Sequence, residues 1–431
     1  MKNVKKRIVL VATLTVLILI SVAFSTPSAA QQGTVVYSFG TTPDGRYPAA
    51  GLVFDPAGNL YGMTGQGGVY SYGTVFELTP NSGGGWTELV LHSFNPNNTK
   101  DGASPLGGLV IDASGNLYGT TELSTGSNGG GTVFEMVAQA GGGWKEKILH
   151  TFTASSAGGQ YPESTLILDA VGNLYGTTSY GGAGTGCGTL GCGTVFELLH
   201  SAGGTWTERV LHTFTNDGTD GYTPFGGLAF DSAGNLYGTT SSGGNVTTCG
   251  SGVGCGTVFE LTPTKSGWTE KILHNFTNNG TDGYAPPNGV VVDAHGNIYG
   301  TTQSGGLHGN GIAFELKPTV GGPWTETVLH NFRYTFNGSD GVNANALIID
   351  SAGNLYSTTR SGGAYGLGTV FKLTNTAGRV WTETILFNFD GANGNASNAG
   401  LVFDAHGNLY GTTQYGGTGT YSDGTVFEVT P

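Results

Sequence analysis

The chain has 431 residues, a formal net charge of −13, 79 glycines and only 10% charged residues. Such an acidic surface repels phosphate backbones and anionic lipid head groups, which argues against nucleic-acid and membrane-surface partners. The glycine content is too high for a helical protein, whereas 37% hydrophobic residues are too many for a disordered one. Because no stretch shows a sustained helical period, we predict an all-β fold.

The first thirty residues have the parts of an export signal. Basic residues within 2–7 are followed by an apolar run at 8–24 and by Ser-Ala-Ala at 28–30, a small-residue cleavage site. We predict a signal peptide over residues 1–30 and a secreted or extracellular protein, with the periplasm or cell surface as alternative destinations. Cleavage leaves 12 basic and 29 acidic groups, a formal charge of −17. The alternative is an uncleaved anchor, because the apolar run approaches the length that spans a bilayer.

A ten-residue stretch, DPAGNLYGMT at residues 55–64, returns seven times in close copies. Its Gly-Asn-Leu/Ile-Tyr core begins at Gly58, Gly115, Gly172, Gly234, Gly296, Gly353 and Gly407. The intervals of 54 to 62 residues indicate that each copy is a supersecondary unit and not one coil of a solenoid.

Each unit contains four strand-like segments in a fixed order. In the first unit these are GLVFD, NLYGMT, GTVFELTP and WTELVLHSF. The Asp-x-x-Gly-Asn between the first two suits a type I turn followed by a residue of positive φ, and a glycine-rich linker joins the last two. Four antiparallel strands repeated seven times predict a seven-bladed β-propeller, a single domain over residues 31–431.

The two ends of the chain complement each other. The last unit stops after GTVFEVTP at residues 424–431 without a fourth strand, whereas an orphan segment, TVVYSF at 34–39, precedes the first unit. We predict that residues 33–39 complete the seventh blade, because a closed ring leaves no free sheet edge. The alternative is an open solenoid or β-helix, which normally ends in atypical capping units. The predicted blades lie near residues 47–94, 105–152, 162–214, 224–276, 286–332, 343–389, and 398–431 with 33–39.

The order of GNLYGTT, GTVFELTP and WTExxLHxF resembles the GloVer-type, or choice-of-anchor, tandem repeats of bacterial secreted proteins. The resemblance covers essentially all of the chain after residue 30. It implies an extracellular protein and brings no catalytic residues to carry over. Family members often end in an anchoring tail, whereas this sequence ends at Pro431 without one, so the resemblance does not predict surface attachment.

Residues that recur in every unit are expected to serve the fold. The first position of the turn is Asp55, Asp112, Asp169, Asp231, Asp293, Asp350 and Asp404. We interpret this Asp as a cap on the following backbone N–H groups, with calcium ligation as the alternative. A Trp opens six fourth strands: Trp86, Trp144, Trp206, Trp268, Trp324 and Trp381. These are interpreted as packing groups on the blade flank, with carbohydrate stacking as the alternative.

Five histidines share the Leu-His-x-Phe position of the fourth strand: His92, His150, His212, His274 and His330. Phe387 and Tyr37 replace them in two copies. We therefore interpret the position as one that needs a flat packed ring, and not an acid, base or metal ligand. The Glu residues of GTVFEL and WTE recur likewise and are interpreted as cross-strand partners or solvated side chains.

Four cysteines interrupt the repeat in matching loops of the third and fourth units. Their close spacing in an exported chain predicts two loop disulfides, Cys187–Cys192 and Cys249–Cys255. The alternative is a four-thiolate metal site that spans the two loops. We predict no metal and no cofactor.

One face of the predicted propeller carries nearly all the variation, namely the loops between the second and third strands and those between blades. The blade-to-blade loops carry Asp-Gly in six copies, at Asp44, Asp101, Asp220, Asp282, Asp340 and Asp390. The residue after the second strand differs between units: Gly65, Glu122, Ser179, Ser241, Gln303, Arg360 and Gln414. We expect these side chains to ring the channel mouth and, with Tyr180, His308 and Tyr415, to bind a glycan or peptide. The alternative is that they are solvated loop residues.

The sequence contains no nucleophile elbow, P-loop, His-Glu-x-x-His or dinucleotide fingerprint. We therefore predict an extracellular binding or structural module. The alternative is a polysaccharide- or peptide-cleaving lyase or hydrolase at the channel mouth, using Glu122, Glu163 and His308. Two such groups within about 10 Å would favour it. A third hypothesis, a surface-layer component, predicts self-association through the blade flanks.

Overall fold

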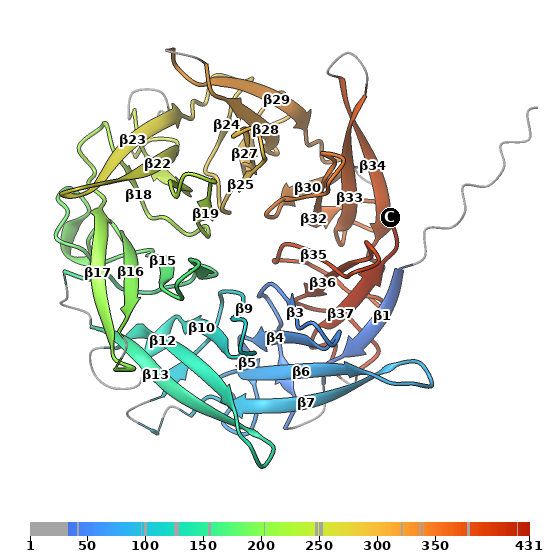
Figure 1. Cartoon of the computed structure of the whole chain (residues 1–431). Helices are drawn as coiled ribbons and strands as arrows, with labels where there is room; N and C mark the ends of the chain where they lie inside the picture. Colours follow the sequence, from blue (N-terminus) through green and yellow to red (C-terminus); the bar gives the residue numbers. More distant parts are fainter. Residues whose placement is uncertain are drawn as a thin grey trace, which may run out of the picture.

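The computed structural model describes residues 33–431 apart from 41–42, 96, 99–100, 125–128, 154–156, 202, 246–248, 250–252, 320–321, 336–337, 339, 377–379 and 420. Seven antiparallel sheets stand around a central axis (Figure 1), and the predicted seven-bladed propeller is confirmed. The predicted signal peptide lies outside the described residues. Within them the one helical element is the 3₁₀ turn η1 (Gly188–Leu190), and no helix is long and apolar enough to cross a membrane.

Each blade begins near the axis with a two-residue strand, and we number the blades 1 to 7 by these strands. The innermost strands are β3 (Val53–Phe54), β9 (Val110–Ile111), β14 (Ile167–Leu168), β19 (Ala229–Phe230), β25 (Val291–Val292), β31 (Ile348–Ile349) and β35 (Val402–Phe403). The second strands are β4 (Leu60–Thr64), β10 (Leu117–Thr121), β15 (Leu174–Thr178), β20 (Leu236–Thr240), β26 (Ile298–Thr301), β32 (Leu355–Gly362) and β36 (Leu409–Thr413). Nearly every residue of the second strands is buried, because blades cover both faces.

The third and fourth strands carry each blade out to the rim. The third strands are β6 (Thr74–Pro80), β12 (Gly129–Ala138), β16 (Thr194–His200), β22 (Thr257–Thr264), β28 (Ile312–Lys317), β33 (Thr369–Thr376) and β37 (Thr425–Val429). The fourth strands are β7 (Trp86–Ser93), β13 (Trp144–Thr153), β17 (Trp206–Thr213), β23 (Gly267–Asn275), β29 (Thr325–Asn331), β34 (Val380–Asn388) and, for blade 7, β1 (Gly33–Ser38).

Short accessory ladders join the blade-to-blade loops to the loops between second and third strands. They are β2 (Gly45–Arg46) with β5 (Gln66–Gly67), β8 (Gly102–Ala103) with β11 (Leu123–Ser124), β18 (Gly221–Tyr222) with β21 (Ser242–Gly243), and β24 (Gly283–Tyr284) with β27 (Ser304–Gly305). In blade 6, β30 (Gly341–Ala344) pairs with the end of β32. These ladders bring the two variable sets of loops together on one face, as predicted.

The N-terminal strand closes the ring. β1 pairs antiparallel with β37, with Val35 opposite Phe427 and Tyr37 opposite Val426, and Figure 1 shows the two strands side by side. Blade 7 therefore has its four strands from both ends of the described chain, as predicted from the orphan segment.

The repeated turn has the predicted cap. Asp55 Oδ1 accepts hydrogen bonds from the backbone N–H groups of Ala57 and Asn59, and Oδ2 accepts from the Asn59 amide and the Tyr61 hydroxyl. Gly58 has a φ of 89°, the positive value that the turn requires. The backbone cap recurs at the other six turn Asp residues.

Aromatic pairs hold neighbouring blades together. A fully buried Phe at or just after the end of each fourth strand meets the Phe of the next blade's third strand edge-on, with ring centroids 5.0 to 5.5 Å apart. All six Trp rings pack against a Tyr of the preceding blade, as Trp144 does against Tyr61 at 5.9 Å. The predicted flank-packing role of Trp is confirmed. These contacts account for a rigid scaffold around the axis.

Candidate functional site

A cavity of about 620 Å³ lies at the propeller axis. The segments that lead into the innermost strands of all seven blades line it, and many of these residues are Gly or Ala, so much of the wall is backbone. The polar side chains of the wall belong to Glu163, Ser164, Thr165, Asn288, Gln303, Asn343, Asn345, Arg360 and Asn398. An axial space lined by groups that differ between blades is the best-formed candidate site in the described part of the chain.

A left-handed residue in each blade-to-blade loop positions the mouth of this cavity. In these loops seven non-glycine residues have φ between 53° and 58°: Tyr47, Ser104, Tyr161, Thr223, Ala285, Asn343 and Ala396. In six blades the carbonyl of this residue accepts, at 3.0 to 3.2 Å, a hydrogen bond from the backbone N–H of the variable residue after the second strand. Such backbone costs on the order of 1 to 3 kcal/mol per residue and clusters at functional sites.

The structure brings part of the predicted ring to the cavity. Gln303 and Arg360 line it directly. Gln414 lies one step behind, because its Oε1 accepts a hydrogen bond at 2.7 Å from the amide of Asn398, which lines the wall. Gly65, Glu122, Ser179 and Ser241 are not wall residues.

The wall also contains amides that the sequence analysis missed. Asn345 donates to Thr358 Oγ1 at 2.7 Å and to the carbonyl of Ser397 at 2.8 Å, which ties blade 6 to blade 7. Asn288 donates to the carbonyl of Ala344 at 3.2 Å. Their position in the repeat could have identified them, because they stand just before the innermost strands, where the sequences of the units differ from one another.

Of the three further residues predicted to bind the ligand, two lie beside the mouth and one does not. Tyr180 packs edge-on against Tyr161 at 5.9 Å, and Tyr415 packs against Tyr47 at 5.3 Å. The partner of each Tyr is a left-handed residue, so both pairs stand beside the mouth. His308 is exposed in the loop between β27 and β28 and does not line the cavity.

Two carboxyl groups lie near each other on blades 2 and 3. Burial raises the pKa of Glu163 and the charge of Glu122 raises it further, although a hydrogen bond from Ser179 Oγ acts in the opposite direction. Burial also raises the pKa of Glu122. Arg360 stands three blades further round the ring, so the wall is acidic on one side and basic on the other.

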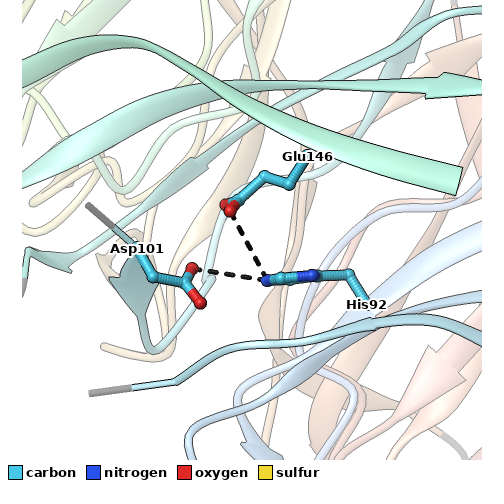
Figure 2. A group of neighbouring side chains, drawn as sticks. All are labelled: His92, Asp101 and Glu146. Atoms are coloured by element: carbon cyan, nitrogen blue, oxygen red, sulfur yellow. Dashed lines mark hydrogen bonds and ion pairs between the residues drawn. The ribbon is translucent and has the colours of Figure 1, made fainter. Parts of the chain in front are cut away.

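A second set of titratable residues lies between the blades. We call the contact between one blade and the next a seam. At four seams a His of one fourth strand, an Asp of the blade-to-blade loop and a Glu of the next fourth strand form a seam cluster: His92–Asp101–Glu146, His212–Asp220–Glu270, His274–Asp282–Glu326 and His330–Asp340–Glu383. Figure 2 shows the first of these, with both carboxylates directed at the imidazole.

These clusters correct two interpretations. The His rings do pack on Phe rings, at 4.6 to 4.9 Å, but their Nε2 atoms also face carboxylates. The Glu of WTE was expected to pair across its own sheet or to be solvated, which is wrong because it crosses to the neighbouring blade. The Glu of GTVFEL is the expected cross-strand partner: Tyr61 lies opposite Glu77 and donates to it at 3.1 Å.

Burial and the adjacent Asp carboxyl together raise the pKa of the cluster Glu residues. The pKa values of the His212, His274 and His330 imidazoles are also raised, but burial has the opposite effect on them. Burial would lower the pKa of each, but the neighbouring Asp and Glu raise it. Each cluster therefore holds its proton more tightly than its isolated groups would.

Three seams depart from this pattern. At the seam of blades 7 and 1, the Tyr37 hydroxyl donates to Asp44 at 3.1 Å. At the seam of blades 2 and 3, Gly158 takes the Asp position, where an added Cβ would touch the Glu208 carboxylate. At the seam of blades 6 and 7, the three positions hold Phe387, Asn393 and Gly33.

The last seam also corrects the count of Asp-Gly loops. Asp390 precedes Gly391, but it does not occupy the position of the other five Asp residues. Asn393 does, because Gly394 behind it packs on Thr413 just as Gly102 behind Asp101 packs on Thr121. Asp390 is exposed and accepts a hydrogen bond from the Asn393 N–H at 3.0 Å.

Both predicted disulfides are present. Cys187 is bonded to Cys192 and Cys249 to Cys255, with Cα atoms 5.3 and 5.4 Å apart. Each bridge closes the loop between the second and third strands of its blade. The four-thiolate metal site considered from the sequence is therefore excluded by the pairing.

The strand pairing and the axial site define a repeat propeller with a variable polar mouth. The chain belongs to the Gloeobacter/Verrucomicrobia repeat family, whose model matches residues 21–190, 90–250 and 245–431. The resemblance drawn from the three repeated segments is thereby confirmed. A search of curated proteins found no match.

Several solved propellers are similar at low identity. One is a gluconolactonase of Xanthomonas campestris, at 14% identity and TM-score 0.40, over 74% of this chain and 82% of that chain. A glucose dehydrogenase is 15% identical over 70% and 93%, at TM-score 0.42. A luciferin-regenerating enzyme is 13% identical over 92% and 95%, at TM-score 0.43. At these values the likenesses carry no argument about activity.

Proposed function

We propose that this propeller is an extracellular binding module whose ligand enters the axial cavity from the variable face. The observation that carries the proposal is the meeting, around one space, of side chains that differ from blade to blade. Repeated residues serve every blade alike, so a single site needs such differences. Glu163, Gln303 and Arg360 supply a carboxyl group, an amide and a cation from three separate blades.

The wall favours a ligand rich in hydroxyl or amide groups, and we favour a glycan. Amide side chains both donate and accept hydrogen bonds, and four Asn side chains stand at the wall beside Gln303. The Tyr pairs beside the mouth offer flat apolar faces on which a sugar ring packs. The net charge of −13 selects against polyanionic glycans. A peptide is the alternative ligand that the test below separates.

Exposed apolar side chains also lie on the variable face. The loop between the second and third strands contributes at least one in every blade: Val69, Tyr70, Tyr72, Leu123, Leu190, Val253, Leu307, Tyr365, Tyr415 and Tyr421. Their exposed fractions run from 36% to 71%. Exposed apolar side chains on the face where the channel opens favour an extended partner, such as a polymer chain, over a small free solute.

The location proposed is outside the cytoplasm. Two disulfides close loops on the variable face, and disulfides form and persist in oxidising compartments. The predicted signal peptide over residues 1–30 points to the same compartment. Mass spectrometry of the protein recovered from outside the cytoplasm tests secretion, and the expected mass is that of the chain without residues 1–30.

A second candidate function is cleavage of the bound polymer by a lyase or hydrolase. The observation that favours it is the carboxyl pair of Glu122 and Glu163, which are close enough for the charge of one to raise the pKa of the other. Two neighbouring carboxyl groups can act as general acid and general base when one is protonated and the other ionised. This activity would release reducing ends from the polymer, and the release should be lost in Glu163→Gln.

The binding proposal is tested on glycan and peptide arrays probed with the purified protein. The expected result is a glycan hit whose signal falls at least tenfold in Arg360→Ala and Glu163→Gln. Arg209→Ala is the matched control, because Arg209 lies on β17 and pairs with Glu197 at 2.7 Å, away from the axis. A hit that both variants retain at full strength would place the site elsewhere, and a peptide hit would replace the glycan.

A further inference from the structure

The four seam clusters have the donor set and spacing of a metal site. The imidazole Nε2 lies 3.2 to 3.4 Å from the Asp oxygen and 3.5 to 3.8 Å from the Glu oxygen in all four. Three ligands that share a tetrahedral ion at bond lengths near 2.1 Å are about 3.4 Å from one another. The nitrogen–oxygen separations are therefore close to those around a common ion, and all three ligand atoms of each cluster lie within 4.8 Å of one another.

Charge within the clusters points to a ligand as well. Each cluster buries two carboxyl groups around one imidazole, so when both carboxyl groups are ionised a protonated His leaves one negative charge without a counter-ion. No hydrogen-bond donor reaches one oxygen of Glu146, Glu270, Glu326 and Glu383. A divalent cation would neutralise both carboxylates and leave the imidazole neutral, as metal ligation requires.

The cluster between blades 4 and 5 is the best formed. The Asp282 side chain is 7% exposed, and its Oδ1 is buried without a hydrogen-bond donor. His274 Nε2 and Glu326 Oε1 are in the same condition. Each of the three residues thus carries a buried polar atom without a hydrogen bond, although His274 Nε2 forms an ion pair with Asp282 Oδ2 at 3.3 Å. Buried polar atoms are normally satisfied, so this cluster calls for an occupant.

The seam of blades 7 and 1 has a Tyr in the His position. There the Tyr37 hydroxyl donates a hydrogen bond to Asp44. This contact satisfies the Asp carboxylate without a metal ion. A hydroxyl proton is therefore enough to satisfy the Asp at the Tyr seam. The His seams differ because a neutral imidazole nitrogen can also bind a metal ion. This contrast makes proton and metal the two occupants that an experiment must separate.

We infer that the four His–Asp–Glu seam clusters are sites for a small divalent cation of the zinc type, held by one imidazole nitrogen and two carboxylates. Each ion joins a fourth strand of one blade to the fourth strand of the next through the Asp of the connecting loop. Nitrogen with oxygen ligands suits zinc better than calcium, which takes six to eight oxygens. The ions would brace the ring from outside the ligand cavity, so this inference is independent of the proposed function.

The test is the stoichiometry of zinc in the tag-free protein, stripped with chelator, exposed to ZnCl₂ and desalted before elemental analysis. The expected result is about four zinc ions per chain, and about three in Glu326→Gln. Glu208→Gln is the matched control, because Glu208 has the same position on its strand but faces Gly158 in place of an Asp. It should keep four.

A gain of one ion tests the same idea from the opposite direction. Gly158→Asp supplies the missing carboxylate between His150 and Glu208, whose Nε2 and Oε2 atoms lie 3.6 Å apart, and should bind a fifth zinc. Replacing the exposed His200, His295, His308 and His406 with Ala controls for surface binding and should change nothing. The inference is overturned if the protein retains no zinc, if Glu326→Gln and Glu208→Gln bind equal amounts, or if Gly158→Asp binds no more than the wild type.

Discussion

Phe387 occupies the space that Gly33 leaves open at the seam of blades 6 and 7. A Cβ atom on Gly33 would overlap the Phe387 ring, and the two residues stand where other seams have Glu and His. The seam that closes the ring thus replaces a charged cluster by an aromatic ring against a glycine. An apolar contact needs no proton or ion, so the seam of blades 6 and 7 depends on neither.

Enlarging Gly33 should loosen this closing seam. Gly33→Leu is expected to lower the free energy of unfolding by about 1 to 3 kcal/mol, because the added side chain forces the Phe387 ring from its place. Urea unfolding at fixed pH measures the change. Thr34→Leu, on the exposed neighbouring position of β1, is the control and should stay within about 0.5 kcal/mol. Equal effects of the two substitutions would mean that Gly33 is not a packing residue.

Removing one turn Asp should cost more than removing an exposed one. Asp231 caps two backbone N–H groups and accepts from the Asn235 amide and the Tyr237 hydroxyl. Burial alone would raise the pKa of Asp231, but these hydrogen bonds lower it. Asp231→Ala is expected to lose about 1 to 3 kcal/mol of unfolding free energy. Asp390→Ala should lose far less, and a similar loss in both would contradict the capping role.

Stability should fall as the pH rises from 5 to 8. Burial, joined at Glu88 by the charge of Asp44, raises the pKa of Glu88 and Glu208 from 4.5 to about 7. Between these values the folded state binds protons that the unfolded state has released. Stabilisation by these carboxyls is thus complete below about pH 4.5 and is lost as the pH passes 7, on the order of 1 to 3 kcal/mol per group.

Thermal unfolding in chelator-containing buffers measures this dependence. Glu208→Gln should flatten the slope, since its amide carries no proton to lose. A wild-type melting temperature that rises from pH 5 to pH 8 would have the wrong sign for this account.

The fold was predictable because its determinants are local and repeated. Asp55 and Gly58 specify a turn that occurs seven times. The segment before residue 40 matches the fourth strand that is missing after the third strand of the last unit. The disulfides followed from short spacing between Cys187 and Cys192. Each of these inferences needs only a pattern within one unit or a comparison of two ends.

The seam clusters could not be read in the same way. Glu146 lies 54 residues after His92 in the sequence, on a strand whose own alternation suggests a cross-strand partner or solvent. Only the packing of blade on blade directs it to that His. Substitution of His by Phe387 suggested a simple packing position, because the companion changes at Asn393 and Gly33 are visible only once the seam is known.

The central claim is that a ligand occupies the axial cavity, and blocking that cavity tests it most directly. Gly51 lines the cavity, and an added Cβ there meets nothing within 4 Å, so Gly51→Trp places a large ring in open space. Gly83→Trp is the control, since Gly83 is equally unhindered in the turn between β6 and β7 on the opposite face. With the array-selected glycan as probe, calorimetry should show binding at least a hundredfold weaker in Gly51→Trp and unchanged in Gly83→Trp. Undiminished binding by Gly51→Trp would contradict the account.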